Sequence, residues 1–203
     1  MRIFLKRALD LAASFFGIVL LMPVFALLSL LITLDSPGGV LFRQWRVGRG
    51  GRLFRVYKFR TMVSGARFLG GGITAAGDPR ITALGQRLRR WKLDELPNLL
   101  NVFLGEMSLV GPRPELPEFI ALLTDEERGI LRVPPGMTGL AQLHYIHEDE
   151  SLTVSAATVE YREQLLRKVR LDLQYVERAG AGYDIIIIFR TLFQLFVPTK
   201  APR

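Results

Sequence analysis

Residues 11–34 read LAASFFGIVLLMPVFALLSLLITL, an uncharged apolar run of 24 residues with Pro23 near its middle. A straight helix of this length reaches about 36 Å, enough to cross the hydrocarbon core of a bilayer, which is about 30 Å thick. A proline in a helix interior removes one hydrogen bond and kinks the chain. The run therefore predicts a membrane helix with a break at Met22-Pro23.

Basic residues flank this run on both sides. They are Arg2, Lys6 and Arg7 before it, and Arg43, Arg46, Arg49, Arg52, Arg55 and Lys58 after it. Short loops rich in Lys and Arg stay on the cytoplasmic side of a membrane. Both ends therefore favour the same side, which predicts a re-entrant helix that enters one leaflet, bends at Pro23 and returns. A kinked helix that spans the bilayer is the alternative that the charges alone leave open.

Composition limits the class of the rest of the chain. The chain has 203 residues, so about 170 remain beyond the N-terminal segment that contains the run, the size of one globular domain. We therefore expect an anchor at residues 1–36 and a domain at residues 37–203. The absence of cysteine excludes disulfides, thiolate zinc sites and a cysteine nucleophile. The run is too long for a cleavable signal peptide and no A-x-A-like site follows it, so we expect it to be retained.

The net charge of +8 narrows the possible partners. A basic chain can bind nucleic acid, anionic lipid or phosphorylated substrates. The arginines cluster beside the membrane run, which favours lipid head groups or a membrane-associated phosphate. No helix-turn-helix, zinc-finger or RNP-type aromatic pattern is present, so we predict membrane lipid and no nucleic acid among the partners.

The remaining pattern predicts an α-rich α+β fold. We expect a hairpin within residues 40–62 that turns at 48–51, a glycine-rich loop at 70–78, an amphipathic helix at 82–93, a second helix with an apolar face from Leu96 to Phe103, a helix start at Thr124, and helices at 160–176 and 183–197. The last helix is too short to span a membrane. We expect it to lie in the membrane interface, with a core helix as the alternative.

Asp94 and Glu95 form the candidate site. Asp94 precedes the second helix as an N-cap would, with Pro97 in the first turn. Unpaired N–H groups and the helix dipole favour negative charge there, so we expect Asp94 to stay ionised and a phosphate to dock beside it. An ionised aspartate can attack phosphorus, with Glu95 as base or metal ligand. Two carboxylates beside a diphosphate also attract Mg²⁺, so Asp94 and Glu95 are the candidate metal ligands.

An ordinary helix cap beside a surface acid explains the same pair, and Asp125-Glu126 is a second acidic pair of that kind. The surroundings set Asp94 apart. Arg87, Arg89, Arg90 and Lys92 precede it, Lys58-Phe59-Arg60-Thr61-Met62 lies upstream, and the stiff turn Gly111-Pro112-Arg113-Pro114 follows. An acidic nucleophile among several arginines is typical of phosphoryl transfer.

Seven motifs follow one another along the chain, namely Arg43-Gln44 with Arg46-Val47-Gly48, Lys58-Phe59-Arg60-Thr61-Met62, Asp78-Pro79-Arg80-Ile81-Thr82, Leu93-Asp94-Glu95-Leu96-Pro97, residues 105–114 (GEMSLVGPRP), Pro135-Gly136-Met137-Thr138-Gly139 and Leu171-Asp172-Leu173. In this order they resemble the bacterial sugar transferase family, the monotopic phosphoglycosyl transferases, in their minimal form. The family's re-entrant helix agrees with the flanking charges. Its break is often Ser-Pro, whereas Met22-Pro23 stands here.

The resemblance implies a phosphoglycosyl transferase that moves a phospho-sugar from a UDP-sugar to undecaprenyl phosphate. The reaction is ping-pong through a covalent phospho-sugar on Asp94, with UMP released, Glu95 completing the dyad and Mg²⁺ required. Arg89 and Arg113 would bind phosphate, and Lys58 and Arg60 would line the same site. The implied location is the cytoplasmic face of the bacterial inner membrane, at the first membrane step of glycoconjugate or exopolysaccharide assembly.

Residues 143–150 depart from the family pattern, so the sugar donor stays open, as do the glycan pathway and the oligomeric state, a homodimer included. His144, His147 and Glu148 in this segment suggest a metal cluster, but a solvated acidic loop is the preferred interpretation. Asp78 is interpreted as the cap of a turn. Two other functions stay in view, a lipid-binding scaffold without catalysis and a metal-dependent hydrolase of lipid phosphates.

Overall fold

The structure is a computed structural model that describes residues 2–66, 78–145 and 159–196. Its α-helices, 3-10 helices (η) and strands are α1 (Arg2–Asp35), β1 (Leu41–Val47), η1 (Arg49–Gly51), β2 (Leu53–Phe59), α2 (Ala83–Arg90), η3 (Leu93–Glu95), α3 (Asn98–Leu104), β3 (Ser108–Val110), α4 (Pro117–Ala121), η4 (Glu127–Arg132), β4 (Gly136–Thr138), α5 (Leu140–His144), α6 (Val159–Arg178) and α7 (Ala181–Phe196). Helices dominate and the two sheets have two strands each, as the α-rich α+β prediction states.

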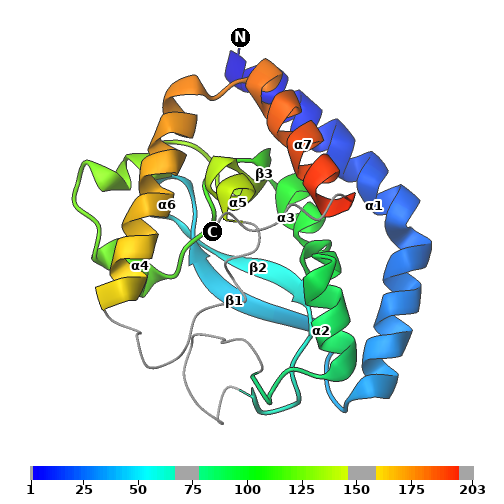
Figure 1. The fold of residues 1–203 in the computed structure, drawn as a ribbon. Helices are drawn as coiled ribbons and strands as arrows, with labels where there is room; N and C mark the ends of the chain where they lie inside the picture. The colour runs from blue at the N-terminus through cyan, green and yellow to red at the C-terminus, as the bar shows by residue number, and fades with distance from the viewer. Residues whose placement is uncertain (1, 67–77, 146–158, 197–203) are drawn as a thin grey trace.

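Helix α1 runs along one side of the molecule and bends on its way, with Pro23 inside it (Figure 1). It is the one described helix long and apolar enough to cross a membrane, and 11% of its most apolar window is buried. Phe4 and Leu20 are 81% and 78% exposed. A core helix of a soluble protein would be mostly covered, so this surface is suited to lipid. The bend agrees with the expected kink, while the path through a bilayer stays a prediction.

Both ends of α1 are attached to the rest of the molecule. Near its start, Lys6 donates to Asp184 of α7 at 2.5 Å and to the Val110 carbonyl of β3 at 3.0 Å. Near its end, Ile32 packs with Phe59 of β2 in one apolar cluster. The helix is therefore part of the fold at both ends rather than a tether.

The hairpin predicted around residues 48–51 is confirmed. β1 and β2 pair antiparallel, from Leu41 opposite Phe59 to Val47 opposite Leu53. Gly50 in the connecting turn has φ +66°, a left-handed conformation that favours glycine. β2 places its alternate residues into the core, which orients Lys58 on a rigid strand.

The parallel pairing of β3 with β4 was not predicted. Ser108 lies opposite Gly136 and Val110 opposite Thr138. A Cβ on Gly136 would lie 2.0 Å from the Gly111 nitrogen, so the two backbones approach as only glycine permits. Three residues are too few to leave an alternating pattern in a sequence.

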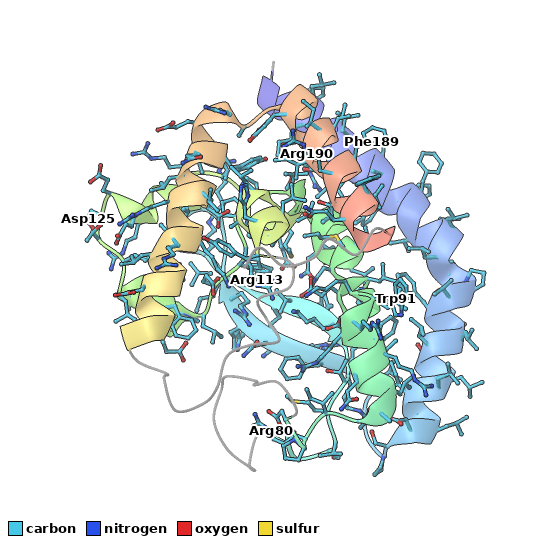
Figure 2. All side chains as sticks on the ribbon, in the orientation of Figure 1. Arg80, Trp91, Arg113, Asp125, Phe189 and Arg190 are labelled. Atoms are coloured by element: carbon cyan, nitrogen blue, oxygen red, sulfur yellow. The ribbon has the colours of Figure 1, made fainter. Side chains whose placement is uncertain are left out.

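The predicted helices at 82–93, 160–176 and 183–197 appear as α2, α6 and α7. The capping box at Thr124 also forms, because its hydroxyl accepts from the Glu127 N–H at 3.3 Å, although a 3-10 helix follows. α7 lies beside α1 (Figure 1) and buries Ile187 while Phe189, 68% exposed, points outward (Figure 2). This amphipathic pattern supports the interfacial interpretation. Most of the expected glycine-rich loop, residues 70–77, lies outside the described residues.

Candidate active site

The chain turns sharply before the acidic pair. α2 ends at Arg90, and Lys92 adopts φ +54°, left-handed and uncommon for a residue with a side chain. Asp94 and Glu95 then lie in the 3-10 turn η3, and α3 begins later, with Pro97 at its N-cap. The expected N-cap role of Asp94 is therefore wrong. The N-terminus of a helix therefore gives no reason to expect Asp94 to stay ionised.

Asp94 is 8% exposed. In the part of the chain that the structure describes, its carboxylate makes no hydrogen bond or ion pair. Burial and the negative charge of Glu95 raise the pKa of Asp94, and the nearby cations Lys58 and Arg89 oppose this shift. Asp94 is thus a buried carboxyl surrounded by positive charge at a distance.

Glu95 has direct partners. Lys58 donates to its Oε1 at 2.6 Å, and the Arg113 guanidinium lies 3.5 Å from the same oxygen. Burial by itself would raise the pKa of Glu95, but the charges of Lys58 and Arg113 outweigh it and hold that pKa well below its usual range. Two adjacent acids therefore have opposite environments.

Three separate elements supply the cations of this site. Lys58 comes from β2, Arg89 from α2, and Arg113 from the turn after β3, where Figure 2 shows it near the centre of the molecule. Arg89 also donates to the Thr61 hydroxyl at 2.8 Å, which joins α2 to the end of β2. The structure thus assembles Asp94, Glu95, Lys58, Arg89 and Arg113.

Arg60 has a different set of contacts. Its guanidinium donates to the carbonyls of Ile32 at 3.2 Å, Ser36 at 2.5 Å and Pro37 at 3.0 Å, all at the end of α1. The last carbonyls of a helix lack intrahelical partners, and a cation there is favourable. In this structure Arg60 therefore holds α1 against β2. Its predicted role in lining the site stays a prediction.

An open pocket of about 770 Å³ begins at Glu95 and Arg113. Further polar side chains line it, namely Lys92, Glu115, Thr138, Gln142, Lys168, Asp172 and Thr191. Sequence reasoning included Asp172 and Thr138 only as members of motifs and missed Gln142 and Thr191 altogether. Asp172 lies between two leucines of the helix predicted at 160–176, and an acid in such an apolar position could have identified it as a functional residue.

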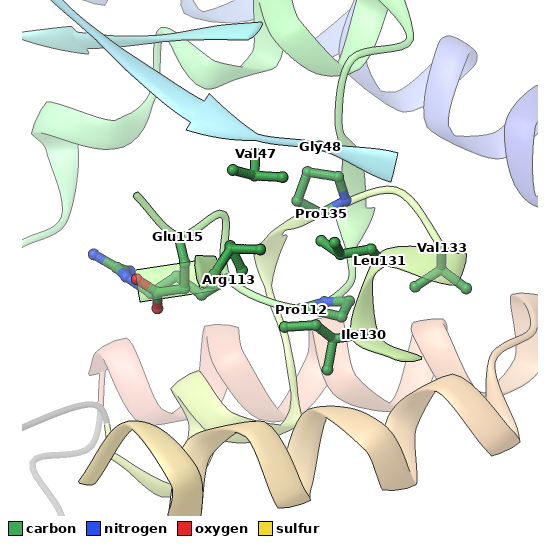
Figure 3. A pocket seen from close by; sticks show the side chains of 10 residues that line it. Val47, Gly48, Pro112, Arg113, Glu115, Ile130, Leu131, Val133 and Pro135 are labelled. Carbon is green, nitrogen blue, oxygen red and sulfur yellow. The ribbon is translucent and has the colours of Figure 1, made fainter. Parts of the chain in front are cut away.

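A smaller pocket of about 230 Å³ lies beside the same turn (Figure 3). Its walls are mostly apolar, with Val47, Ile130, Leu131 and Pro135 among them. The Arg113 and Glu115 side chains extend to one side of these apolar residues (Figure 3). Its lining suits packing rather than a charged substrate.

Mg²⁺ in proteins is commonly held by one or two carboxylates together with substrate phosphates. The unpartnered carboxylate of Asp94 and the adjacent Glu95 fit such a site. Among the described residues, no three His, Cys, Asp or Glu side chains gather as a metal cage. His144 bonds to the Leu140 carbonyl at 3.0 Å, whereas His147 and Glu148 lie outside the described residues. The phosphates of a substrate would complete the ligand set.

Comparison with known proteins defines the class of this chain. The sequence model for the family "Bacterial sugar transferase" matches residues 1–198. The chain therefore belongs to the bacterial sugar transferase family, as the motifs predicted.

Three relatives show the range of this similarity. The chain is 42% identical over 92% of its length to an undecaprenyl-phosphate glucose phosphotransferase of Komagataeibacter xylinus, and covers 35% of that protein. It is 36% identical over 97% of its length to a UDP-glucose:undecaprenyl-phosphate glucose-1-phosphate transferase of Escherichia coli (strain K12), and covers 41% of it. It is 39% identical over 95% of its length to the exopolysaccharide production protein PSS of Rhizobium leguminosarum bv. phaseoli, and covers 95% of it. The chain thus spans less than half of the first two relatives and nearly all of the third.

Proposed function

We propose that this protein transfers a phospho-sugar from a UDP-sugar to undecaprenyl phosphate at the cytoplasmic face of the bacterial inner membrane. One observation carries the proposal: a buried aspartate that has no hydrogen bond or ion pair within residues 2–66, 78–145 and 159–196 lies inside a group of cations, next to a glutamate that is already paired. The names of the relatives support the class of reaction and the lipid acceptor. The exposed apolar surface of α1 supports the membrane location.

The environments of the two acids favour Asp94 as the nucleophile. Glu95 is occupied by Lys58 and Arg113, whereas the Asp94 oxygens are available to attack. An Asp94 oxygen forms a bond to the phosphorus that carries the sugar, and the bond from that phosphorus to the UMP oxygen breaks with its electron pair on UMP. A phosphate oxygen of the lipid then attacks the same phosphorus, and the bond to Asp94 breaks.

The cations lower the barrier of both steps. Attack by a carboxylate on a diphosphate brings negative charges together, and guanidinium and ammonium groups neutralise the charge that develops. In this proposal Arg89 and Arg113 hold phosphate oxygens, and their positive charges beside Asp94 and Glu95 support that role, while Lys58 keeps Glu95 ionised beside the nucleophile. Mg²⁺, when bound, would supply further neutralisation of the diphosphate and lower the pKa of Asp94.

Release of UMP tests the proposal. The purified protein in nanodiscs, with Mg²⁺ and undecaprenyl phosphate, is offered a panel of UDP-sugars. We expect release with at least one donor, dependent on the lipid, and its loss in Asp94→Asn. Asp125→Asn, the same change in the other acidic pair, is the matched control and keeps full activity. A folded, inserted Asp94→Asn protein with near-normal transfer would contradict the proposal. Release of inorganic phosphate without a nucleotide donor would indicate the hydrolase.

A further inference from the structure

Two residues that line the pocket beside Glu95 carry polar atoms that find no hydrogen-bond partner among the described residues. Both amide atoms of Gln142, and Oδ1 of Asp172, are shielded from solvent and make no hydrogen bond in the described part of the chain. Asp172 is only 4% exposed. Buried polar groups without partners cost free energy, so native proteins keep few of them. Two such side chains on one pocket wall indicate that a ligand completes their hydrogen bonds.

The chemistry of this wall suits hydroxyl groups. Burial and the negative charge of Glu115 raise the pKa of Asp172 to about 8. The backbone N–H groups of Arg113 and Ala141, which stabilise the charged form, oppose this shift. Near neutral pH the Asp172 carboxyl is thus mostly protonated and can both donate and accept, as can the Gln142 amide. Thr191 contributes a hydroxyl 2.8 Å from that of Thr138. A sugar hydroxyl, itself donor and acceptor, matches such a wall, whereas a polyprenyl chain does not.

The position of the pocket indicates which part of the donor it binds. Glu95 and Arg113, which border the nucleophile, also line this pocket. In a UDP-sugar, one oxygen joins the anomeric carbon to the phosphorus that Asp94 attacks, whereas the uracil lies beyond the second phosphate and the ribose. We infer that the pocket binds the sugar of the donor, and that Gln142 and Asp172 select it through its hydroxyl groups. This inference rests on the proposed function.

Binding requires a local movement of both side chains. The amide atoms of Gln142 and Oδ1 of Asp172 are covered in this structure, so both side chains turn toward the pocket when a sugar enters. Rotation about the side-chain torsions of a glutamine is fast compared with turnover. The sugar hydroxyls then replace the missing partners of Gln142 and Asp172.

Equilibrium binding to the full chain in nanodiscs with Mg²⁺ tests the inference, in an Asp94→Asn background that prevents turnover. Calorimetry gives the Kd of UDP, UDP-glucose, UDP-galactose and the two UDP-N-acetylhexosamines. We expect one sugar nucleotide to bind more tightly than UDP. Gln142→Met and Asp172→Ala should weaken it about tenfold and leave the Kd of UDP unchanged. Asp172→Asn, which keeps a donor and an acceptor, should retain the affinity.

Gln86→Met and Asp125→Ala make the same chemical changes at exposed positions and serve as matched controls. Thermal unfolding shows that each variant is folded. Equal weakening of UDP and the sugar nucleotides would assign the pocket to the nucleotide and overturn the inference. Unchanged affinities in both pocket variants, or no donor tighter than UDP, would overturn it too. A donor that binds to this wall but gives no UMP with the wild type would refute the proposed function alone.

Discussion

Two neighbouring carboxyl groups differ because of what surrounds them. Glu95 is paired with Lys58 and Arg113, so its pKa falls. Asp94 is buried beside the charge of Glu95, and its carboxylate has no ion pair in the described part of the chain, so its pKa rises. Titratable groups with pKa values pushed apart are characteristic of catalytic sites. The sequence predicted the pair, Lys58 and Arg113, but it contained no information on which cation contacts which acid. That assignment depends on β2, η3 and the turn after β3 meeting in space.

Removal of the cation that pairs with Glu95 tests this arrangement. We expect Lys58→Met to destabilise the protein by roughly 1–3 kcal/mol near neutral pH, because it leaves a buried carboxylate with a weaker partner. In the wild type, the lowered pKa gives stability that is present above about pH 4.5 and lost as the pH falls. In Lys58→Met we expect burial, now opposed by fewer cations, to raise the pKa of Glu95 above its value in the unfolded chain, so that stability decreases as the pH increases through that pKa. Thermal unfolding between pH 5 and pH 8 measures the difference.

The double variant Lys58→Met/Glu95→Gln is the control for that measurement. It has no carboxyl at position 95, so the added pH dependence should disappear and part of the lost stability should return. An equal loss of stability at both pH values would show that Lys58 acts through packing and not through the charge of Glu95.

At the scale of elements, α2 packs unusually close to the chain after β2. A Cβ on Gly85 would lie 2.1 Å from the Thr61 carbonyl oxygen, and this is backbone that cannot rotate away. We expect Gly85→Ala to displace α2, to destabilise the protein by about 1–3 kcal/mol, and to reduce activity because α2 carries Arg89. Gly182→Ala in α7, where nothing lies within 4 Å, is the matched control and should unfold as the wild type does. Unfolding curves that coincide for the two variants would contradict the close packing.

Arg60 joins two elements to which the proposed function gives different substrates. In that proposal β2 belongs to the site of the soluble donor, while α1 carries the apolar surface expected to contact lipid. We expect Arg60→Met to slow transfer to the lipid acceptor about tenfold and to leave the first burst of UMP release unchanged, because the anchor shifts and the donor site does not. Rapid-quench kinetics without and with undecaprenyl phosphate separates the two half-reactions.

Arg52→Met, at an exposed position of the hairpin turn, is the control for Arg60→Met and should change neither half-reaction. If Arg60 instead binds substrate phosphate, as the family resemblance implies, the burst itself slows in Arg60→Met. If Arg60 holds α1, the variant slows the transfer to lipid. If Arg60 binds substrate phosphate, the variant slows the release of UMP.

Helices and strands were predictable where apolar and polar residues recur with a regular period over many residues. The amphipathic patterns of α2, α6 and α7 and the alternation in β1 and β2 met this condition. The start of α3 did not, since Asp94 and Pro97 allow both an N-cap and a separate 3-10 turn, and tertiary packing decided between them. The β3–β4 pair depends on Gly111 meeting Gly136, a contact that local sequence cannot show.

At the scale of the whole molecule, α1 is attached at both ends, and between them one face packs against α3 while large apolar side chains such as Leu20 and Leu27 stay exposed. Lys6 is held by Asp184, and the last turn is held by Arg60. The helix has 34 residues, about 51 Å at 1.5 Å per residue. A helix that spans a bilayer places its ends on opposite sides of a core about 30 Å thick. Attachment of both ends to one folded domain therefore supports the re-entrant path over the spanning one.

The chain has no cysteine, so single cysteines report topology without background. If both ends of α1 face the cytoplasm, as the re-entrant path requires, Arg2→Cys and Arg52→Cys should react with a membrane-impermeant maleimide in inverted membrane vesicles and not in intact cells. Leu20→Cys, in the exposed apolar middle of α1, should react only after detergent is added, because lipid covers it. Labelling of positions 2 and 52 from opposite sides would establish a spanning helix. The contacts of Lys6 or Arg60 would then have to break in the membrane, since one domain cannot bind both ends across a bilayer.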